Sequence, residues 1–117
     1  MEFDTLFWQG MEDLIHTNRV IVDRPKGNPH PLHPELVYPL DYGYLENTTS
    51  GDGDGIDIWM GSLKSKTLTG ILCTFDRIRS DAEIKLLIGC TNKDVQNIRN
   101  FHHEMLTLFI PNPLTDR

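Results

Sequence analysis

Two long apolar segments joined by a short polar turn place the strongest constraint on how this chain folds. Residues 68–76 read LTGILCTFD and residues 82–90 read AEIKLLIGC, and both segments are rich in residues that favour β-strands. Only the residues RIRSD separate them, which is the length of a hairpin loop. The sequence therefore predicts an antiparallel β-hairpin over 68–90.

Helical patterns stand on both sides of this hairpin. Residues 2–16 place apolar side chains at three- and four-residue steps with acidic residues between them, which predicts an amphipathic helix. Residues 91–110 return to the helical period, and Thr91 or Asn92 can cap this second helix. We expect the residues after it, 111–117, to fray.

Extended segments and loops fill the rest of the chain. Strands are expected over 19–23, 37–45 and 56–61, with a proline-rich loop over 24–35 and a turn-rich loop over 47–55. In the last strand, Trp59 is expected in the core or an interface. Taken together, helices and about five strands predict an α+β, mainly β fold: one domain over 1–117, built as a small OB-like barrel with the terminal helices packed outside.

Composition narrows the class of function. The chain has 117 residues and a net charge of -6, which argues against nucleic-acid binding, because a nucleic-acid binder carries a basic surface. An anionic substrate must therefore be received through metal ions or a local basic cluster. The first residues are acidic where a secretion signal needs basic ones, and no apolar run is long enough to span a bilayer. We expect a cytoplasmic protein that does not associate with membranes.

The segment DGDGID, residues 52–57, concentrates three carboxylates next to two glycines. A solvated turn explains it most simply, because Asp and Gly both favour turns. An EF-hand calcium loop does not fit, since the fifth, sixth and twelfth positions hold Ile56, Asp57 and Leu63. A magnesium site for phosphate chemistry does fit, because magnesium takes oxygen ligands and bridges carboxylates to phosphates.

Two further acids favour the magnesium site. Asp76 ends the first strand of the predicted hairpin and Asp81 stands next to the start of the second. The hairpin brings both to one end of the sheet, where we expect them to converge with the DGDGID carboxylates. Bound cations would remove the repulsion between so many negative charges.

The order of these motifs resembles a known family. YPLDYGYLENTTSGDGDGIDIW, residues 38–59, is similar to the Y-P-x-N-Y-G-[YF] strand and D-G-D-P-x-D loop of the soluble, magnesium-dependent inorganic pyrophosphatases of family I. GILCTFDRIRSDAEIKLL, residues 70–87, resembles that family's G-V-x-x-x-x-D-x-x-x-x-D-x-K segment. The resemblance covers residues 37–90 and implies an OB-like barrel that hydrolyses pyrophosphate to two phosphates with Mg2+.

The resemblance also implies roles for individual residues. Asp52, Asp57 and Asp81 would hold two metals beside the attacking water, and Asp76 with Asp81 would hold magnesium carried by the substrate. Asp54 would be the general base for that water.

The same resemblance suggests how the substrate is bound. Tyr42 would hydrogen-bond a phosphate oxygen. The family's basic residues before the aromatic strand do not align cleanly, and only DRPKG offers candidates, Arg24 and Lys26.

Other positions depart from the family pattern. Glu83 stands where a lysine is expected, and Lys85, two residues later on the same strand face, is a candidate substitute for binding phosphate. Met105 and Leu106 align with a Tyr-Lys pair that grips phosphate. Gly55 replaces a proline and Asp41 an asparagine.

These departures keep other functions open. The chain is either a pyrophosphate hydrolase, or a weak or inactive homologue that binds metal and phosphate, or a hydrolase of another phosphoanhydride or nucleotide. The first helix carries Phe3, Phe7 and Trp8 near one edge, and exposed apolar patches of that kind mark interfaces. We therefore also expect a homo-oligomer, with packing of these side chains against the barrel as the alternative.

Overall fold

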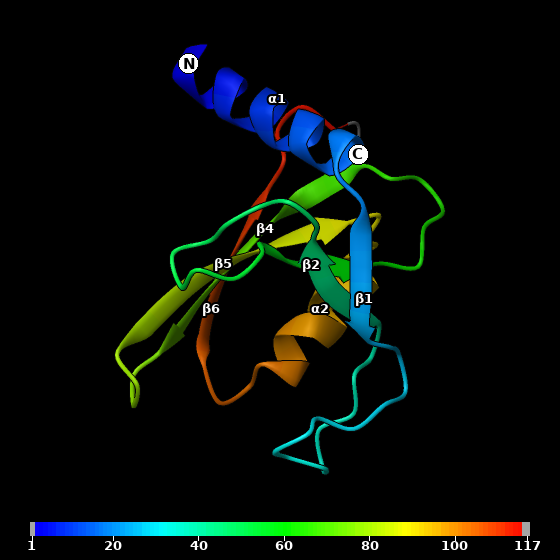
Figure 1. The fold of residues 1–117 in the computed structure, drawn as a ribbon, viewed down its shortest axis with the longest axis vertical. Coiled ribbons are helices and arrows are strands. Elements are labelled where there is room, and N and C mark those ends of the chain that lie inside the picture. The colour runs from blue at the N-terminus through cyan, green and yellow to red at the C-terminus, as the bar shows by residue number, and fades with distance from the viewer. Residues whose placement is uncertain (1, 116–117) are drawn as a thin grey trace.

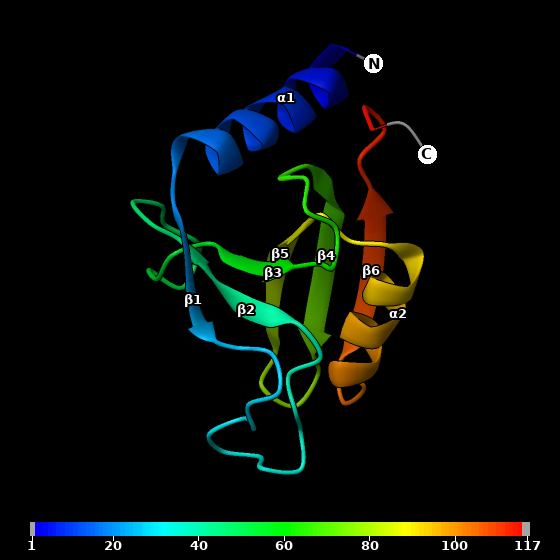
Figure 2. The same cartoon turned by 90° about the vertical axis from the view of Figure 1, so that its right-hand side faces the viewer.

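The computed structural model describes residues 2–115, which form two helices and six strands (Figure 1; Figure 2). In chain order these elements are α1 (Glu2–Thr17), β1 (Val20–Arg24), β2 (Asp41–Leu45), β3 (Asp57–Met60), β4 (Leu68–Asp76), β5 (Asp81–Ile88), α2 (Asn92–Phe101) and β6 (Leu106–Pro111). In the described part of the chain, neither helix combines the length and the apolar character that crossing a bilayer requires.

All six strands belong to one sheet with the order β1-β2-β3-β5-β4-β6. Neighbouring strands are antiparallel except β3 and β5, which pair in parallel, Ile58 with Leu86. The predicted hairpin is confirmed as β4 and β5, which pair along their whole length to Asp76 opposite Asp81. The mainly β class with outer helices is confirmed. The sheet, however, has six strands rather than about five, and β1 and β6 are its two ends.

The two helices pack in two separate core clusters, one on each face of this curved sheet, and α1 lies across one end of it (Figure 2). On the α1 face, Trp8 and Ile15 pack with Ile58 and Leu86. The α2 face buries the aromatic and aliphatic side chains Tyr38, Leu40, Trp59, Leu72, Leu87, Val95 and Ile98. Successive residues of a strand point to opposite faces, so the neighbours Ile58 and Trp59 are both fully buried. The expected core position of Trp59 is confirmed.

The predicted second helix begins correctly but ends early. Thr91 is its N-cap and forms a capping box with Asp94. The helix ends at Phe101, and the prediction of helix beyond that residue is wrong, because Leu106–Pro111 form strand β6 against the free edge of β4. Backbone pairing with that edge, from Leu106 opposite Phe75 to Pro111 opposite Gly70, outweighs the helical spacing of the apolar side chains.

The segment after β6 is not frayed as predicted, at least to residue 115. Asn112 is fully buried, and its side-chain amide donates to the carbonyl of Leu68 at 2.9 Å and to Glu12 Oε1 at 3.3 Å. Glu12 Oε1 also accepts from the backbone N–H of Leu68 at 3.0 Å. This network joins α1, β4 and the segment after β6. Residues 116 and 117, which belong to the same prediction, lie outside the described residues.

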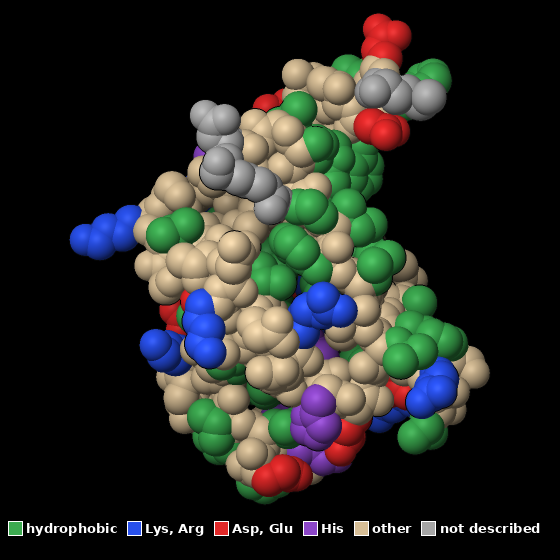
Figure 3. All heavy atoms as spheres, turned by 180° about the vertical axis from the view of Figure 1, so that it is seen from behind, with side chains coloured by type: hydrophobic (Ala, Val, Ile, Leu, Met, Phe, Trp, Pro, Cys, Tyr) green, Lys and Arg blue, Asp and Glu red, His purple; other side chains and the backbone are tan. Residues whose placement is uncertain are grey.

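Apolar side chains remain exposed on part of the α1 face. Trp8 packs in the core, whereas Phe3 and Phe7 are 78% and 45% exposed. Beyond the area that α1 covers, side chains of β4, β5 and β6 on the same face are also exposed: Phe75, Ile84, Leu106, Leu108 and Ile110. We call these residues, with Phe3, Leu6 and Phe7, the apolar face. Figure 3 shows hydrophobic side chains gathered along one side of the molecule from α1 downward.

Candidate active site

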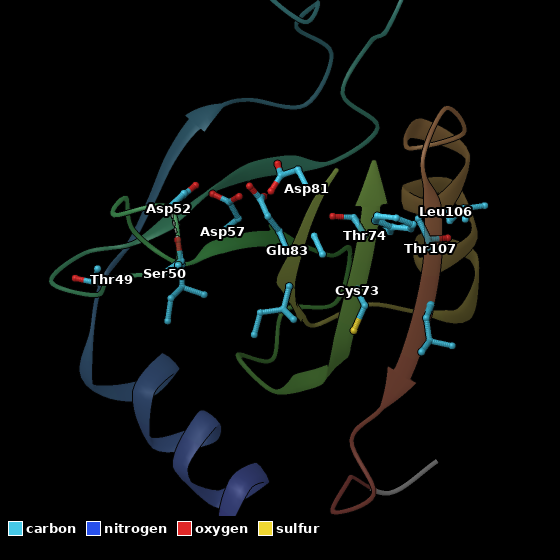
Figure 4. Close-up of a pocket in the computed structure, with 16 residues that line it drawn as sticks. Thr49, Ser50, Asp52, Asp57, Cys73, Thr74, Asp81, Glu83, Leu106 and Thr107 are labelled. Atoms are coloured by element: carbon cyan, nitrogen blue, oxygen red, sulfur yellow. Dashed lines mark hydrogen bonds between the residues drawn. The ribbon is translucent and has the colours of Figure 1, made fainter. Parts of the chain in front are cut away.

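A pocket of about 800 Å³ opens where the loop before β3 meets the hairpin end of β4 and β5 (Figure 4). Four carboxylates line it: Asp52, Asp57, Asp81 and Glu83. The opposite wall is formed by β4 and β6 and includes Thr74, Phe75, Leu106 and Thr107. Figure 4 shows the four acidic side chains in a row along one side, contributed by three separate segments of the chain. The pocket is therefore acidic on one side and largely apolar on the other.

Asp52 is held by the turn that the loop makes around it. Its Oδ1 accepts from Ser50 Oγ at 2.5 Å and from the backbone N–H of Asp54 at 2.9 Å. The hydrogen bond from Ser50 and that from Asp54 hold the pKa of the Asp52 carboxyl below its usual value. Gly53 completes the turn with a φ of 89°, a conformation that side chains disfavour. Asp52 therefore stays ionised at the pocket mouth.

Gly55 explains one departure from the family pattern. A Cβ at this position would come 2.7 Å from Tyr44 Cδ2 and 3.1 Å from the Leu45 carbonyl oxygen. At Gly55 the loop therefore packs so closely against β2 that a residue with a Cβ would need its neighbours to move. The proline that the resembled family carries here does not fit this backbone without movement.

The predicted acid pair of the hairpin is only half inside the pocket. Asp76 and Asp81 are register partners, as predicted, and Asp81 lines the pocket. Asp76 Oδ1 instead accepts from the backbone N–H groups of Ile78 and Arg79 at 3.0 and 3.1 Å. Asp54 is exposed and does not belong to the pocket lining either. The structure therefore brings three of the five predicted aspartates together around one pocket.

Glu83 is the acid that sequence reasoning did not assign to the site. It follows Asp81 by two residues on β5, so both side chains lie on one face of the strand and Glu83 becomes the fourth carboxylate of the pocket. That alternation was the signal available in the sequence. The family pattern instead predicts a lysine at this position.

Lys85 lies behind the acidic side of the pocket. Its side chain is 7% exposed, and its ammonium donates to Tyr42 Oη at 2.7 Å, Asp57 Oδ2 at 3.0 Å and Glu83 Oε1 at 3.4 Å. These acceptors match the three donors of an ammonium group. Burial, and next the charge of Asp57, raises the pKa of Tyr42, so its hydroxyl stays protonated. Lys85 and Tyr42 thus support the pocket without belonging to its lining.

The other predicted basic residues lie elsewhere. Arg24 ends β1 opposite Tyr42, and the backbone N–H of Lys26 donates to Asp41 Oδ1 at 2.8 Å. Both are exposed, and neither lines the pocket. As described, the pocket lining contains no lysine, arginine or histidine.

An aromatic cluster underlies Lys85 on the α2 face. Trp59 contacts Tyr42 with ring centroids 4.7 Å apart, and His102 meets Trp59 edge-on at 5.7 Å. Among the described residues, Trp59 Nε1 and His102 Nε2 are buried without a hydrogen-bond partner. Burial, with the nearby Lys85 charge, lowers the pKa of His102 to about 3, so this imidazole is neutral in the folded protein.

The donor set of the pocket suits a hard divalent cation. Magnesium prefers carboxylate oxygens and commonly uses only one or two of them, with water and substrate phosphate completing its shell. No three His, Cys, Asp or Glu side chains of residues 2–115 approach closely enough to hold an ion as they stand. Occupation of the pocket by a metal would therefore draw these side chains closer together.

Comparisons with known proteins agree with the motifs. The sequence model of the Pyrophosphatase family, described as inorganic pyrophosphatase, matches residues 11–99. The inorganic pyrophosphatase of Streptomyces coelicolor is 30% identical over 74% of this chain and 54% of its own length. That of Wigglesworthia glossinidia brevipalpis is 32% identical over 63% of this chain and 50% of its own length. The chain thus spans about half the length of these curated relatives.

A solved structure extends the likeness to the fold. The inorganic pyrophosphatase of Coxiella burnetii superposes with a TM-score of 0.53 at 14% identity, over 79% of this chain and 82% of that one. At this identity the likeness concerns the fold alone. With the family model matching from α1 to α2, and the acidic motifs placed around one pocket, the chain belongs to the inorganic pyrophosphatase family.

Proposed function

We propose that this chain hydrolyses inorganic pyrophosphate to two phosphates with the help of Mg2+. One observation carries the proposal: Asp52 and Asp57 of the DGDGID loop and Asp81 of the hairpin line a single pocket together with Glu83. An unassisted pyrophosphate would be repelled by these carboxylates. Divalent cations reverse that repulsion, which makes an acidic pocket suitable for a phosphate substrate.

The metal would be held by Asp52, Asp57 and Asp81, with Glu83 as a further oxygen donor. When bound, the cation supplies charge neutralisation at the phosphates and a water molecule of lowered pKa. In this proposal Asp76 joins Asp81 in holding magnesium that arrives with the substrate. Its present hydrogen bonds to the turn would have to be shared or released.

The general base and the groups that bind phosphate are side chains of this chain. Asp54 takes the proton of the attacking water, and its backbone N–H bond to Asp52 keeps it beside the metal-binding carboxylates. In this proposal the protonated hydroxyl of Tyr42 donates to a phosphate oxygen, which requires the substrate to reach behind the present pocket lining, where Tyr42 accepts from Lys85. Arg24 and Lys26, exposed at the end of β1, attract the substrate anion, and Lys85 provides positive charge from behind.

The direct test is phosphate release from pyrophosphate with and without Mg2+, beside a panel of nucleotides. Asp81→Asn should lower the rate strongly, because it removes a pocket carboxylate that is exposed and bears no buried ion pair. Asp13→Asn, an exposed aspartate of α1, is the matched control and should leave the rate unchanged. Faster release from a nucleotide than from pyrophosphate would redirect the substrate assignment.

A second candidate function is binding of metal and phosphate without turnover. The observation that favours it is the composition of the described pocket lining, which has no basic side chain to grip phosphate. Calorimetry with phosphate and Mg2+ separates the two: heat of binding without phosphate release at any Mg2+ concentration would establish this alternative.

We also propose that a second copy of the chain covers the apolar face. With roughly 200 Å² for a whole large side chain, the exposed fractions of its residues leave on the order of 800 Å² uncovered. This is about the area that each partner contributes to a standard stable interface. The face reaches the pocket wall through Phe75, Ile84, Leu106 and Leu108. We also propose a cytoplasmic location, which rests on the acidic first residues and the short apolar runs of the sequence.

A further inference from the structure

Lys85 places its ammonium group between two of the pocket carboxylates. Its ammonium bonds Asp57 and Glu83, whose side chains are about one-third exposed, at 30% and 31%, and belong to the pocket lining, whereas the Lys85 side chain is only 7% exposed. Tyr42 fixes the ammonium from a third direction, and the Tyr42 ring centroid lies 5.1 Å from Nζ. The inner side of the acidic row therefore already holds a cation, one supplied by the chain itself.

We infer that the Lys85 ammonium competes with divalent metal for Asp57 and Glu83, and so sets how tightly the pocket binds metal. The inference rests on the proposed function in that it takes these carboxylates as metal ligands. It goes beyond that function because it assigns Lys85 to the carboxylates rather than to the phosphate.

Two physical effects act in the same direction. Oxygen lone pairs of Asp57 and Glu83 that accept from the ammonium are less available to a metal unless Lys85 moves. The ammonium also repels the cation directly. A single and a double charge about 4 Å apart repel by roughly 2 kcal/mol even at the dielectric constant of water, and by more in a partly buried site.

The lengths of the three Lys85 hydrogen bonds indicate the order in which a bound metal would break them. The bond to Glu83 is the longest of the three at 3.4 Å, so a metal ion should capture Glu83 first. Lys85 then remains with Tyr42 and Asp57, its two closer partners. Only a cation that draws on Asp57 as well has to displace the lysine.

The test measures binding of Mg2+, and of Mn2+ as its spectroscopic substitute, by calorimetry and electron paramagnetic resonance without pyrophosphate. Lys85→Met should bind metal at least about tenfold more tightly than the wild type, as expected for the loss of a repulsion of this size. The control Lys93→Met removes the same charge from the exposed start of α2 and should leave the affinity unchanged. Equal or weaker binding by Lys85→Met overturns the inference.

Folding gives an independent readout, because Lys85→Met leaves two carboxylates facing each other without their cation. Without metal this variant should melt below the wild type, and Mg2+ should raise its melting temperature more than that of the wild type. An equal or smaller rise overturns the inference even if the variant is too unstable for calorimetry. If no chain binds metal, the proposed metal site fails too. If the wild type binds metal and hydrolyses pyrophosphate while Lys85→Met binds no more tightly, only this inference fails.

Discussion

His102 should make the protein sensitive to mild acid, and the size of the effect follows from its surroundings. The side chain is buried where α2 ends, edge-on to Trp59 and Phe101, with Nε2 unpartnered among the described residues. Burial and the Lys85 charge lower its pKa to about 3. In the unfolded chain the same imidazole titrates near its ordinary value of 6.5. Between about pH 3 and pH 6.5 the unfolded chain therefore binds a proton at His102 that the folded protein does not bind.

The sign follows from proton linkage. Above pH 6.5 the imidazole is neutral in both states, and the stabilising contribution of neutral His102 is fully present. As the pH falls below that value, only the unfolded chain gains the proton, so the free energy of unfolding drops by about 1.4 kcal/mol per pH unit. At about pH 5 the loss amounts to roughly 2 kcal/mol, a figure that holds for any folded pKa well below 5.

Urea unfolding at about pH 7 and about pH 5 measures this loss directly. His102→Gln should remove roughly 2 kcal/mol of the difference between the two pH values, because glutamine does not titrate. His103→Gln is the matched control: His103 is exposed, so its removal should leave the difference as in the wild type. If His102→Gln and the wild type lose the same free energy between the two pH values, the imidazole is not held neutral by burial.

Three further outcomes follow from the structure. Asp54→Asn should reduce phosphate release by about 10²- to 10⁴-fold and leave Mn2+ affinity unchanged, because an amide accepts no proton; turnover near the wild-type rate would remove Asp54 as the base. Asn112→Ala should cost about 1–3 kcal/mol in urea unfolding, since it leaves the buried Leu68 carbonyl short of a donor, whereas Asn100→Ala on the exposed side of α2 should cost little. Light scattering should give twice the chain mass of 13.4 kDa, and Leu108→Glu should restore the single mass; a wild-type monomer would mean that the apolar face stays uncovered.

Local signals predicted the elements whose partners are close in sequence. The hairpin of β4 and β5 was predictable because its two strands and its turn are contiguous. The first helix was predictable from its apolar period. Leu108 fits both the helical spacing of α2 and the alternation of Leu106, Leu108 and Ile110, so the sequence does not choose between helix and strand there. The free edge of β4 makes that choice, and it lies more than thirty residues earlier.

The same distinction applies to the site. Asp52, Asp57 and Asp81 were found because their motifs and strand positions place them at one end of the sheet. The inward position of Lys85 depends on Tyr42 and Asp57, which stand 43 and 28 residues away, and no local pattern encodes that meeting. Glu83, by contrast, was within reach of sequence reasoning, because it alternates with Asp81 on β5.

Glu12 contacts Asn112 across 100 residues of chain, and this contact has a consequence for how the protein is made. At synthesis rates of about 5–20 residues per second, those residues take roughly 5–20 s to leave the ribosome. During that time α1 can contact β4 through the hydrogen bond between Glu12 and Leu68. The edge of β4 that pairs with β6 remains without its partner strand. Long-range pairing of this kind folds slowly. The nascent chain should therefore stay sensitive to proteases until residue 112 has emerged, and ribosome-stalled chains that carry this sequence on C-terminal linkers of increasing length should show the change.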